Sequence, residues 1–156
     1  HYFSSKDALF KAVMEHYFKA VEHEESPYEW KDVLLSEHLK DRIEKAKRML
    51  EHSNIPKNIG MLNYFILTFQ ALEMNPELAE YSYQMHESVI KKWKAIITNS
   101  IYSGEVKKGT DIDKTASLFM NIRHGIGVTS SFNTTMKDSI EAIDEMYQYI
   151  FSLIQS

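Results

Sequence analysis

The 156-residue sequence contains no cysteine and few residues that interrupt helices. The absence of cysteine excludes disulfide bonds, thiolate nucleophiles and cysteine zinc sites, and it is typical of a reducing compartment. We therefore expect a cytoplasmic protein. Prolines number three and glycines five, and such sparse breakers favour long helical segments.

Long hydrophobic runs are also missing. No apolar stretch reaches the roughly 18 residues that a membrane-spanning helix requires. Apolar residues make up 44% and charged residues 26% of the chain, which indicates a soluble globular domain. The formal charge is −4 and basic residues are interleaved with acids, as in residues 40–45. This pattern predicts solvated helix surfaces rather than a nucleic-acid-binding surface.

Motifs for catalysis and for cofactor binding are absent as well. Neither His-Glu-x-x-His nor Glu-x-x-His occurs around the seven histidines, so the minimum spacings of zinc peptidases and di-iron bundles are lacking. The sequence also lacks a P-loop, a Gly-x-Ser-x-Gly motif and a Gly-x-Gly-x-x-Gly motif. We therefore expect no enzymatic activity, no metal site and no cofactor.

The sequence does contain apolar residues at three- and four-residue spacing along its whole length. This spacing predicts an all-α fold, an antiparallel helical bundle of about six helices. Asn75-Pro76-Glu77 is a helix-start signal, and Gly104 is placed to end the same helix in a left-handed conformation. The expected helices cover about residues 5–25, 36–52, 58–74, 76–103, 113–132 and 135–154.

The last two expected helices predict close helix pairing. Gly125 and Gly127 interrupt the fifth, and the close approach of another helix would offset the stability that they cost. The sixth expected helix has apolar residues at alternating spacings of four and three, which is the pattern of paired helices. These residues, called the seam below, are Met136, Ile140, Ile143, Tyr147, Ile150 and Ile154. Its second apolar face consists of Met146, Tyr149 and Leu153.

One face of the sixth helix can pack in the domain's own core while the other contacts a partner. The alternative is that both faces lie inside a monomeric bundle. We expect a homodimer, because apolar surface of this extent stabilises association strongly. The expected contact residues are Phe119, Ile126, Ile140, Ile143, Tyr147 and Ile150.

Methionine and aromatic residues are frequent in the middle of the chain. Methionine adapts its shape and tyrosine offers a polar tip on a flat ring, a combination that lines adaptable pockets for flat or greasy ligands. An ordinary core is the alternative for each residue, and His124 is alternatively a hydrogen-bonded core histidine. The expected pocket residues are Met61, Tyr64, Phe65, Phe69, Tyr81, Met85, Trp93, Met120 and His124.

The first ten residues, HYFSSKDALF, combine the aromatic residues Tyr2 and Phe3 with a polar cap, then Lys6, Asp7 and Leu9. This stretch resembles the end of the DNA-binding domain in TetR-family (tetracycline-repressor-like) transcriptional regulators, where an aromatic cluster precedes the helix that links to the regulatory domain. The order of residue types is fairly specific, and it concerns the beginning of the chain.

A second stretch resembles the same family. Gly104-Glu105-Val106 is followed by Asp111-Ile112-Asp113, Ala116 and Gly125. The pattern is similar to the Gly-Glu-Leu, Asp-Leu-Asp, Ala and Gly positions before the family's eighth helix, although it is weak on its own. The segment 26–35 is longer than the family's usual link.

The resemblance implies a TetR-like regulatory domain of a homodimeric one-component repressor. In that family an N-terminal helix-turn-helix binds operator DNA, and a small ligand in the helical domain alters the half-site spacing. Residues 1–4 would be a remnant of the DNA-binding domain, most of which is missing, and residues 5–156 the ligand-binding and dimerisation domain. Tyr2 and Lys6 match positions that often contact DNA phosphate in the family.

Two other classes of protein remain open from the sequence. A stand-alone helical interaction module would expose an apolar groove and have no closed pocket. A helical-bundle enzyme would need convergent polar groups, which the motifs do not supply. A pocket within one chain beside a two-fold helical interface would distinguish the regulator from both.

Overall fold

The computed structural model describes residues 2–6, 8–13, 30, 32–52, 66, 69–70, 72–74, 76–130 and 136–156. The protein is all-α, as predicted. The helices with defined bounds are α2 (Leu35–His52), α4 (Pro76–Ser103), α5 (Ile112–Ser130) and α6 (Met136–Ile154). Among the described residues, β pairing is limited to an antiparallel bridge between Val106 and Gln155.

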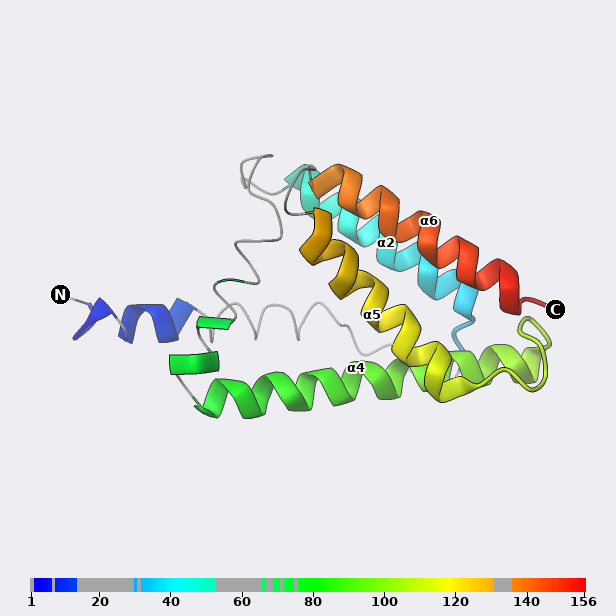
Figure 1. Cartoon of the computed structure of the whole chain (residues 1–156), viewed down its shortest axis with the longest axis horizontal. Coiled ribbons are helices and arrows are strands. Elements are labelled where there is room, and N and C mark those ends of the chain that lie inside the picture. Colours follow the sequence, from blue (N-terminus) through cyan, green and yellow to red (C-terminus); the bar gives the residue numbers. More distant parts are fainter. Residues whose placement is uncertain are drawn as a thin grey trace.

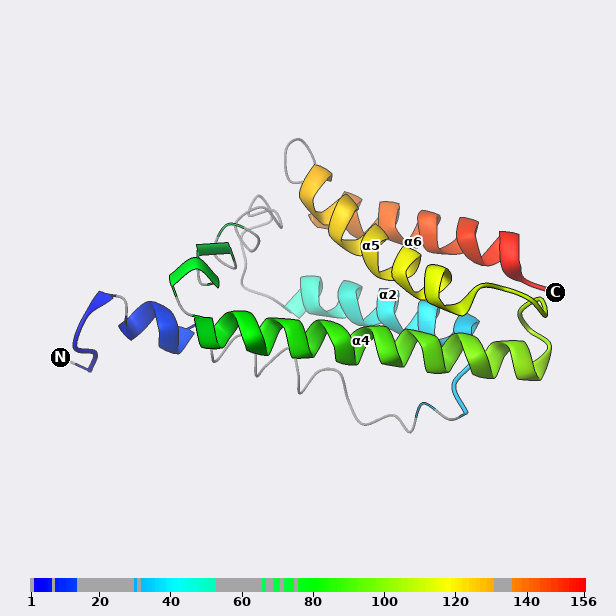
Figure 2. The ribbon, with the colours of Figure 1, turned by 60° about the horizontal axis from the view of Figure 1, so that its bottom comes forward.

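The four helices form a bundle in which contacting neighbours run antiparallel (Figure 1). Helices α2, α5 and α6 lie over the C-terminal half of α4, whose N-terminal half extends toward the beginning of the chain (Figure 2). The most extensive helix contacts join α4 to α2 and α5, and α6 to α2 and α5. The bundle therefore closes around one core, as four-helix packing requires.

Local signals account for the helix ends. Helix α4 begins at Pro76 and ends at Ser103, as predicted, and Gly104 follows with φ of 84°. At this angle glycine avoids the steric penalty of a side chain. Ser5 Oγ accepts a hydrogen bond from the Ala8 amide at 3.0 Å, so the first helix starts where we expected. Its predicted continuation over 14–25 lies outside the described residues.

Aromatic stacking defines the centre of the core. The Trp93 ring of α4 stacks on Phe119 of α5 with centroids 5.0 Å apart. Tyr147 of α6 meets both rings edge-on at 5.9 and 5.5 Å. These geometries are favourable for aromatic quadrupoles, and each fully buried large apolar side chain contributes about 1.5 to 3 kcal/mol. Leu39 and Ile43 of α2 complete this core.

The predicted dimer contacts lie inside this core. Phe119, Ile140, Ile143, Tyr147 and Ile150 are all buried within the single chain, and Ile126 is partly buried against them. For the five buried residues the expectation that they contact a second chain is therefore wrong, because other helices of the same chain cover them. For Ile126, which is partly buried, the contact stays a prediction.

The second apolar face of α6 is the one that solvent reaches. Met146, Tyr149 and Leu153 are exposed by 41%, 60% and 55%. This stripe of α6 is called the outer face below, and Leu118 of α5 is also exposed, by 48%. The sequence pattern identified both faces, but it assigned the residues of the buried seam to the dimer interface.

Gly125 of α5 also departs from expectation. A side-chain carbon added at this position meets no atom within 4 Å. Close approach of another helix within the described chain therefore does not explain this glycine. Gly127, by contrast, is buried.

Candidate ligand-binding site

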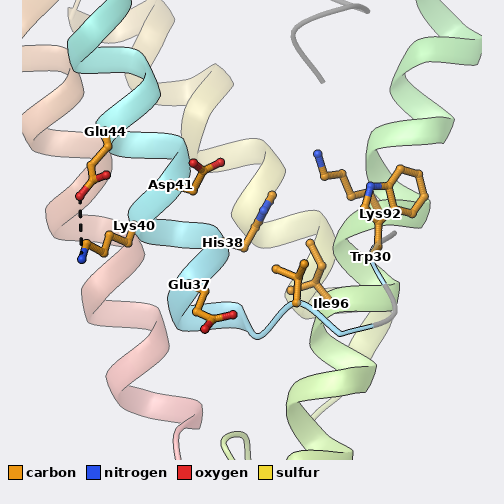
Figure 3. Close-up of a pocket in the computed structure, with 9 residues that line it drawn as sticks. Trp30, Glu37, His38, Lys40, Asp41, Glu44, Lys92 and Ile96 are labelled. Atoms are coloured by element: carbon orange, nitrogen blue, oxygen red, sulfur yellow. Dashed lines mark ion pairs between the residues drawn. The ribbon is translucent and has the colours of Figure 1, made fainter. Parts of the chain in front are cut away.

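A pocket of about 390 Å³ lies between α2 and the C-terminal half of α4 (Figure 3). Trp30 and Val33, which precede α2 in the chain, contribute to its wall. The volume is at the low end of the roughly 300 to 1,000 Å³ typical of small-molecule sites. The residues that line it are Trp30, Val33, Glu37, His38, Lys40, Asp41, Glu44, Lys92 and Ile96.

Long-range hydrogen bonds position the α2 wall of the pocket. The Leu35 amide at the start of α2 donates to Ser100 Oγ at 2.7 Å and to Glu105 Oε2 at 2.9 Å. The Ser36 hydroxyl also donates to the Glu105 carboxylate. Because Leu34 has no side-chain acceptor, these residues from the end of α4 and the loop after it act as the cap of α2. A carboxylate here also complements the positive end of the helix dipole.

Two contacts hold Trp30 against α4. The Asn99 side-chain amide donates a hydrogen bond to the Trp30 carbonyl oxygen. The Lys92 ammonium lies 5.8 Å from the centroid of the indole ring, within the range of a cation–π interaction. The indole therefore forms a wall whose position depends on α4.

His38 lies at the boundary between the pocket and the core. It is 6% exposed, and its ring meets the Trp93 ring edge-on with centroids 4.8 Å apart. Burial, reinforced by the nearby charges of Arg42 and Lys92, lowers the pKa of His38 from 6.5 to about 2. The ring is therefore neutral at physiological pH, with one nitrogen that donates and one that accepts.

Two buried nitrogens among the pocket residues have no hydrogen-bond partner within the described structure. They are Nε1 of Trp30 and Nε2 of His38. An unsatisfied buried polar atom costs about 1 to 3 kcal/mol, and most buried polar groups in proteins avoid this cost. Each of the two atoms has less than 1 Å² of accessible surface, so both lie in the packed wall behind the cavity rather than on its open surface.

The α2 side of the pocket carries carboxylates. Glu37 and Asp41 lie near the cavity, and Glu44 forms an ion pair with Lys40 at 3.9 Å (Figure 3). That pair is exposed and contributes little to stability. The α2 side of the pocket thus carries both carboxylates and the Lys40 ammonium, whereas the α4 side carries the Lys92 ammonium.

The structure does not gather the predicted pocket residues into one site. Met61, Tyr64 and Phe65 lie outside the described residues. Phe69 is 63% exposed, so its assignment to a pocket wall is wrong. Tyr81 and Met85 are partly buried in a separate small cluster with Phe10 and Leu72.

The remaining predicted pocket residues belong to other surroundings. Trp93 and Met120 are buried in the core, so the alternative of ordinary core packing is correct for both. His124 lies beside His86 of α4, with ring centroids 6.5 Å apart. Partial burial, together with the charge of Arg123, lowers the pKa of His124. Neither histidine of this pair lines the pocket.

The residues that do form the pocket carried a weaker signal in the sequence. Lys92 interrupts an apolar stripe of α4 between Val89 and Ile96, and His38 interrupts the stripe of α2 beside Leu39. A polar residue on an apolar stripe indicates either a buried network or a site. Trp30 lies in a connection, where a large aromatic residue is rarely required by local structure.

Tyr2 and Lys6 lie at the N-terminal end of the described chain, and both are exposed. Lys6 is in the first turn of the helix that Ser5 caps. Exposed amides at such a start favour anions, so the contact of these residues with DNA phosphate stays a prediction.

In the described ranges, no three His, Asp or Glu residues are arranged to hold a metal ion. The helices described there are also too short or too polar to cross a membrane. Comparison of the chain with protein-family models, curated proteins and solved structures found no match.

Proposed function

We propose that this chain is the ligand-binding and dimerisation domain of a one-component transcriptional repressor, which releases operator DNA when a small, partly apolar molecule binds. The observation that carries the proposal is the pocket between α2 and α4, which both apolar and charged side chains line. The resemblance of residues 1–10 and 104–125 to TetR-family regulators supports the link to DNA. In this proposal the protein is cytoplasmic and not an enzyme.

Helix α4 offers a physical connection from the pocket to the N-terminal segment. Lys92 and Ile96 line the pocket, and about two turns earlier on the same helix Met85 and Tyr81 cluster with Phe10 of the first helix. A ligand that changes the separation of α2 and α4 would therefore shift the helix that carries Lys6. Coupling between two such sites is typically about 1 to 3 kcal/mol, which alters DNA affinity by roughly 5- to 150-fold.

The outer face supports the homodimer that such a regulator needs. Met146, Tyr149, Leu153 and Leu118 expose apolar surface that the chain itself leaves uncovered. The open space beside Gly125 lies on the same helix as Leu118 and would admit a neighbouring helix. A stable interface needs about 800 Å² per partner, and helix pairs from two copies can supply it.

The DNA-release proposal is tested with the complete protein, including whatever precedes residue 1. Binding to DNA from upstream of its own gene is followed by fluorescence anisotropy during titration with small molecules. We expect a ligand to weaken DNA binding, and we expect the pocket variant Lys92→Met to need more ligand than Lys91→Met, which alters the exposed neighbouring lysine. Absence of DNA binding, or DNA binding that no ligand changes, would contradict the proposal.

The homodimer is tested by sedimentation equilibrium at micromolar concentration. Leu153→Glu places a charge in the outer face and should convert a dimer to a monomer, because an unpaired charge at an apolar interface is strongly unfavourable. Ser152→Glu is the matched control, since Ser152 is an exposed polar neighbour on the same helix. A monomeric wild-type protein would leave a stand-alone interaction module as the better description of this surface.

A further inference from the structure

We propose that the end of α5 is an acid-responsive hinge: when His86 of α4 and His124 of α5 both gain protons, the segment 125–130 moves away from α4. The inference goes beyond the proposed function, because the movement requires neither a ligand nor DNA. It follows from a histidine pair at the place where the two helices diverge and from the residues that come directly after that pair.

The histidine pair lies at the edge of the contact between α4 and α5. The two helices pack closely at Trp93 and Phe119, whose ring centroids are 5.0 Å apart, and α5 then diverges from α4 toward its C-terminal end (Figure 1 and Figure 2). His86 precedes Trp93 by about two turns of α4. Its ring lies at 21° to that of His124, with centroids 6.5 Å apart. The pair therefore joins the two helices where they begin to separate.

Both rings can gain a proton from solvent. His86 and His124 are accessible to water, and the ordinary pKa of a histidine side chain places its change of charge between about pH 5 and 8. Two charged rings at 6.5 Å repel each other, and salt screens this repulsion only in part, since the Debye length is about 8 Å at physiological ionic strength. Acid therefore converts a contact between neutral rings into a contact between like charges.

The surroundings of His124 strengthen this effect. Among the described residues, the groups whose charge acts on His124 are Arg123 of its own helix, His86 of α4 and Arg42 of α2, and none belongs to α6. Partial burial, reinforced by these positive charges, lowers the pKa of His124. A conformation in which the end of α5 has moved away relieves the burial and the repulsion, so it binds a proton more readily. Acid therefore favours that conformation.

The segment that follows His124 is suited to bending. It contains Gly125 and Gly127, and glycine has the most flexible backbone of all residues. The Thr129 hydroxyl donates a hydrogen bond to the Gly125 carbonyl oxygen at 2.8 Å, and such bonds to a carbonyl four residues earlier weaken and often bend helices. A side-chain carbon at Gly125 would meet no atom within 4 Å. The end of α5 can therefore bend after His124 without disturbing the aromatic core.

Spin-label distances in the full chain test the hinge. The sequence contains no cysteine, so labels attach only at introduced cysteines. Tyr83→Cys and Val128→Cys replace exposed side chains about one turn beyond His86 and His124. Double electron–electron resonance follows the distance from about pH 7.5 to about pH 5.5, the range in which histidine titrates. Excess unlabelled protein restricts the measurement to distances within one chain.

Circular dichroism confirms native helix content at each pH. If the wild type unfolds within the range, the measurements are made in His38→Gln, in which the core histidine no longer titrates. Acid should lengthen the distance between positions 83 and 128 by about 2 to 5 Å, the scale of helix movements in switching proteins. A control pair, Tyr102→Cys and Lys114→Cys, spans the packed end of α4 and α5 and should keep a constant distance.

Matched variants connect the movement to the pair and to the hinge. His86→Gln and His124→Gln should each abolish the shift, whereas Ser88→Gln, at an exposed position near His86, should retain it. Gly125→Ala should reduce the shift, because alanine fits at this position and stiffens the helix. In NMR titrations, His86→Gln should raise the pKa of His124 by about half a unit or more, since one neighbouring charge is removed.

An unchanged distance between positions 83 and 128, or an equal shift in the two histidine variants, would overturn the inference. A pKa of His124 that does not respond to His86→Gln would overturn it as well. A shift that Gly125→Ala leaves intact, that Ser88→Gln abolishes, or that the control pair shares would place the movement elsewhere and contradict the hinge.

Discussion

Neighbouring residues of α4 face two different environments. Trp93 is stacked on Phe119 and meets Tyr147 in a fully packed aromatic core. Lys92, one residue earlier, lines a pocket that carries mixed charges and has unpartnered nitrogens in the wall behind it. The same two helices, α2 and α4, thus make both a dry core and a polar cavity, and His38 contacts both. The difference shows that one side of α4 is fully packed whereas the adjacent side leaves a cavity.

A pocket of this kind lowers the stability of the folded chain. Unsatisfied buried polar atoms are unfavourable, and an apolar filling would be more stable. Natural proteins break packing rules of this kind mainly at functional sites. The contrast between core and pocket is therefore itself an argument for function, and the following experiments test it.

The largest expected effect on stability comes from replacing each of the two tryptophans with alanine in turn. Trp93→Ala removes a ring that is 1% exposed and should lower the free energy of unfolding by about 3 to 5 kcal/mol. Trp30→Ala, in the wall of the pocket, should cost clearly less because that ring is only partly buried. Urea unfolding followed by circular dichroism measures both. Equal losses would contradict the division into core and pocket.

His38 should make the boundary between core and pocket sensitive to acid. Its folded pKa lies well below the unfolded value of 6.5, so below that pH the unfolded chain binds a proton that the folded chain does not. Stability therefore falls as the pH drops below 6.5, by about 2 kcal/mol near pH 5, relative to neutral pH.

His38→Gln should remove this part of the pH dependence, because glutamine does not titrate. Urea unfolding of both proteins between about pH 7.5 and 5 measures the difference. Parallel pH profiles for the two proteins would show that His38 is protonated equally in the folded and unfolded chains.

The smallest of these effects concerns the cap that holds the α2 wall of the pocket. Glu105→Ala removes the carboxylate that accepts from Leu35 and Ser36 and should cost about 1 kcal/mol. Hydrogen exchange should accelerate at the Leu35 amide in particular. Glu145→Ala, at an exposed acid on α6, is the control and should change neither. Unchanged exchange at Leu35 would show that Ser100 alone suffices as the cap.

Features encoded within a few residues were predicted well from the sequence. Both ends of α4 were correct because Pro76 and Gly104 act through their own backbone preferences. The all-α class followed from the spacing of apolar residues. In the same way, Ser5 caps the first helix by accepting a hydrogen bond from the Ala8 amide, only three residues later in the chain.

Features that depend on distant segments were not predicted. The pocket requires Trp30 and His38 to meet Lys92, and the cap of α2 requires Glu105, some 70 positions away. The partners of the two faces of α6 were not predicted for the same reason. The spacing of apolar residues indicates that a helix face is buried, but it does not identify the helix that covers it.

The sequence by itself determined the helices α2, α4, α5 and α6, the two ends of α4 and the presence of two apolar faces on α6. Propensity, capping and periodicity act over one or two turns of backbone, so these features need no distant segment. Only the tertiary structure decided that the seam of α6 packs inside the chain and that Met146, Tyr149 and Leu153 face solvent. It also decided that the cavity lies beside Lys92 rather than around Trp93. These choices depend on how four helices share a limited volume, and that is a property of their mutual packing.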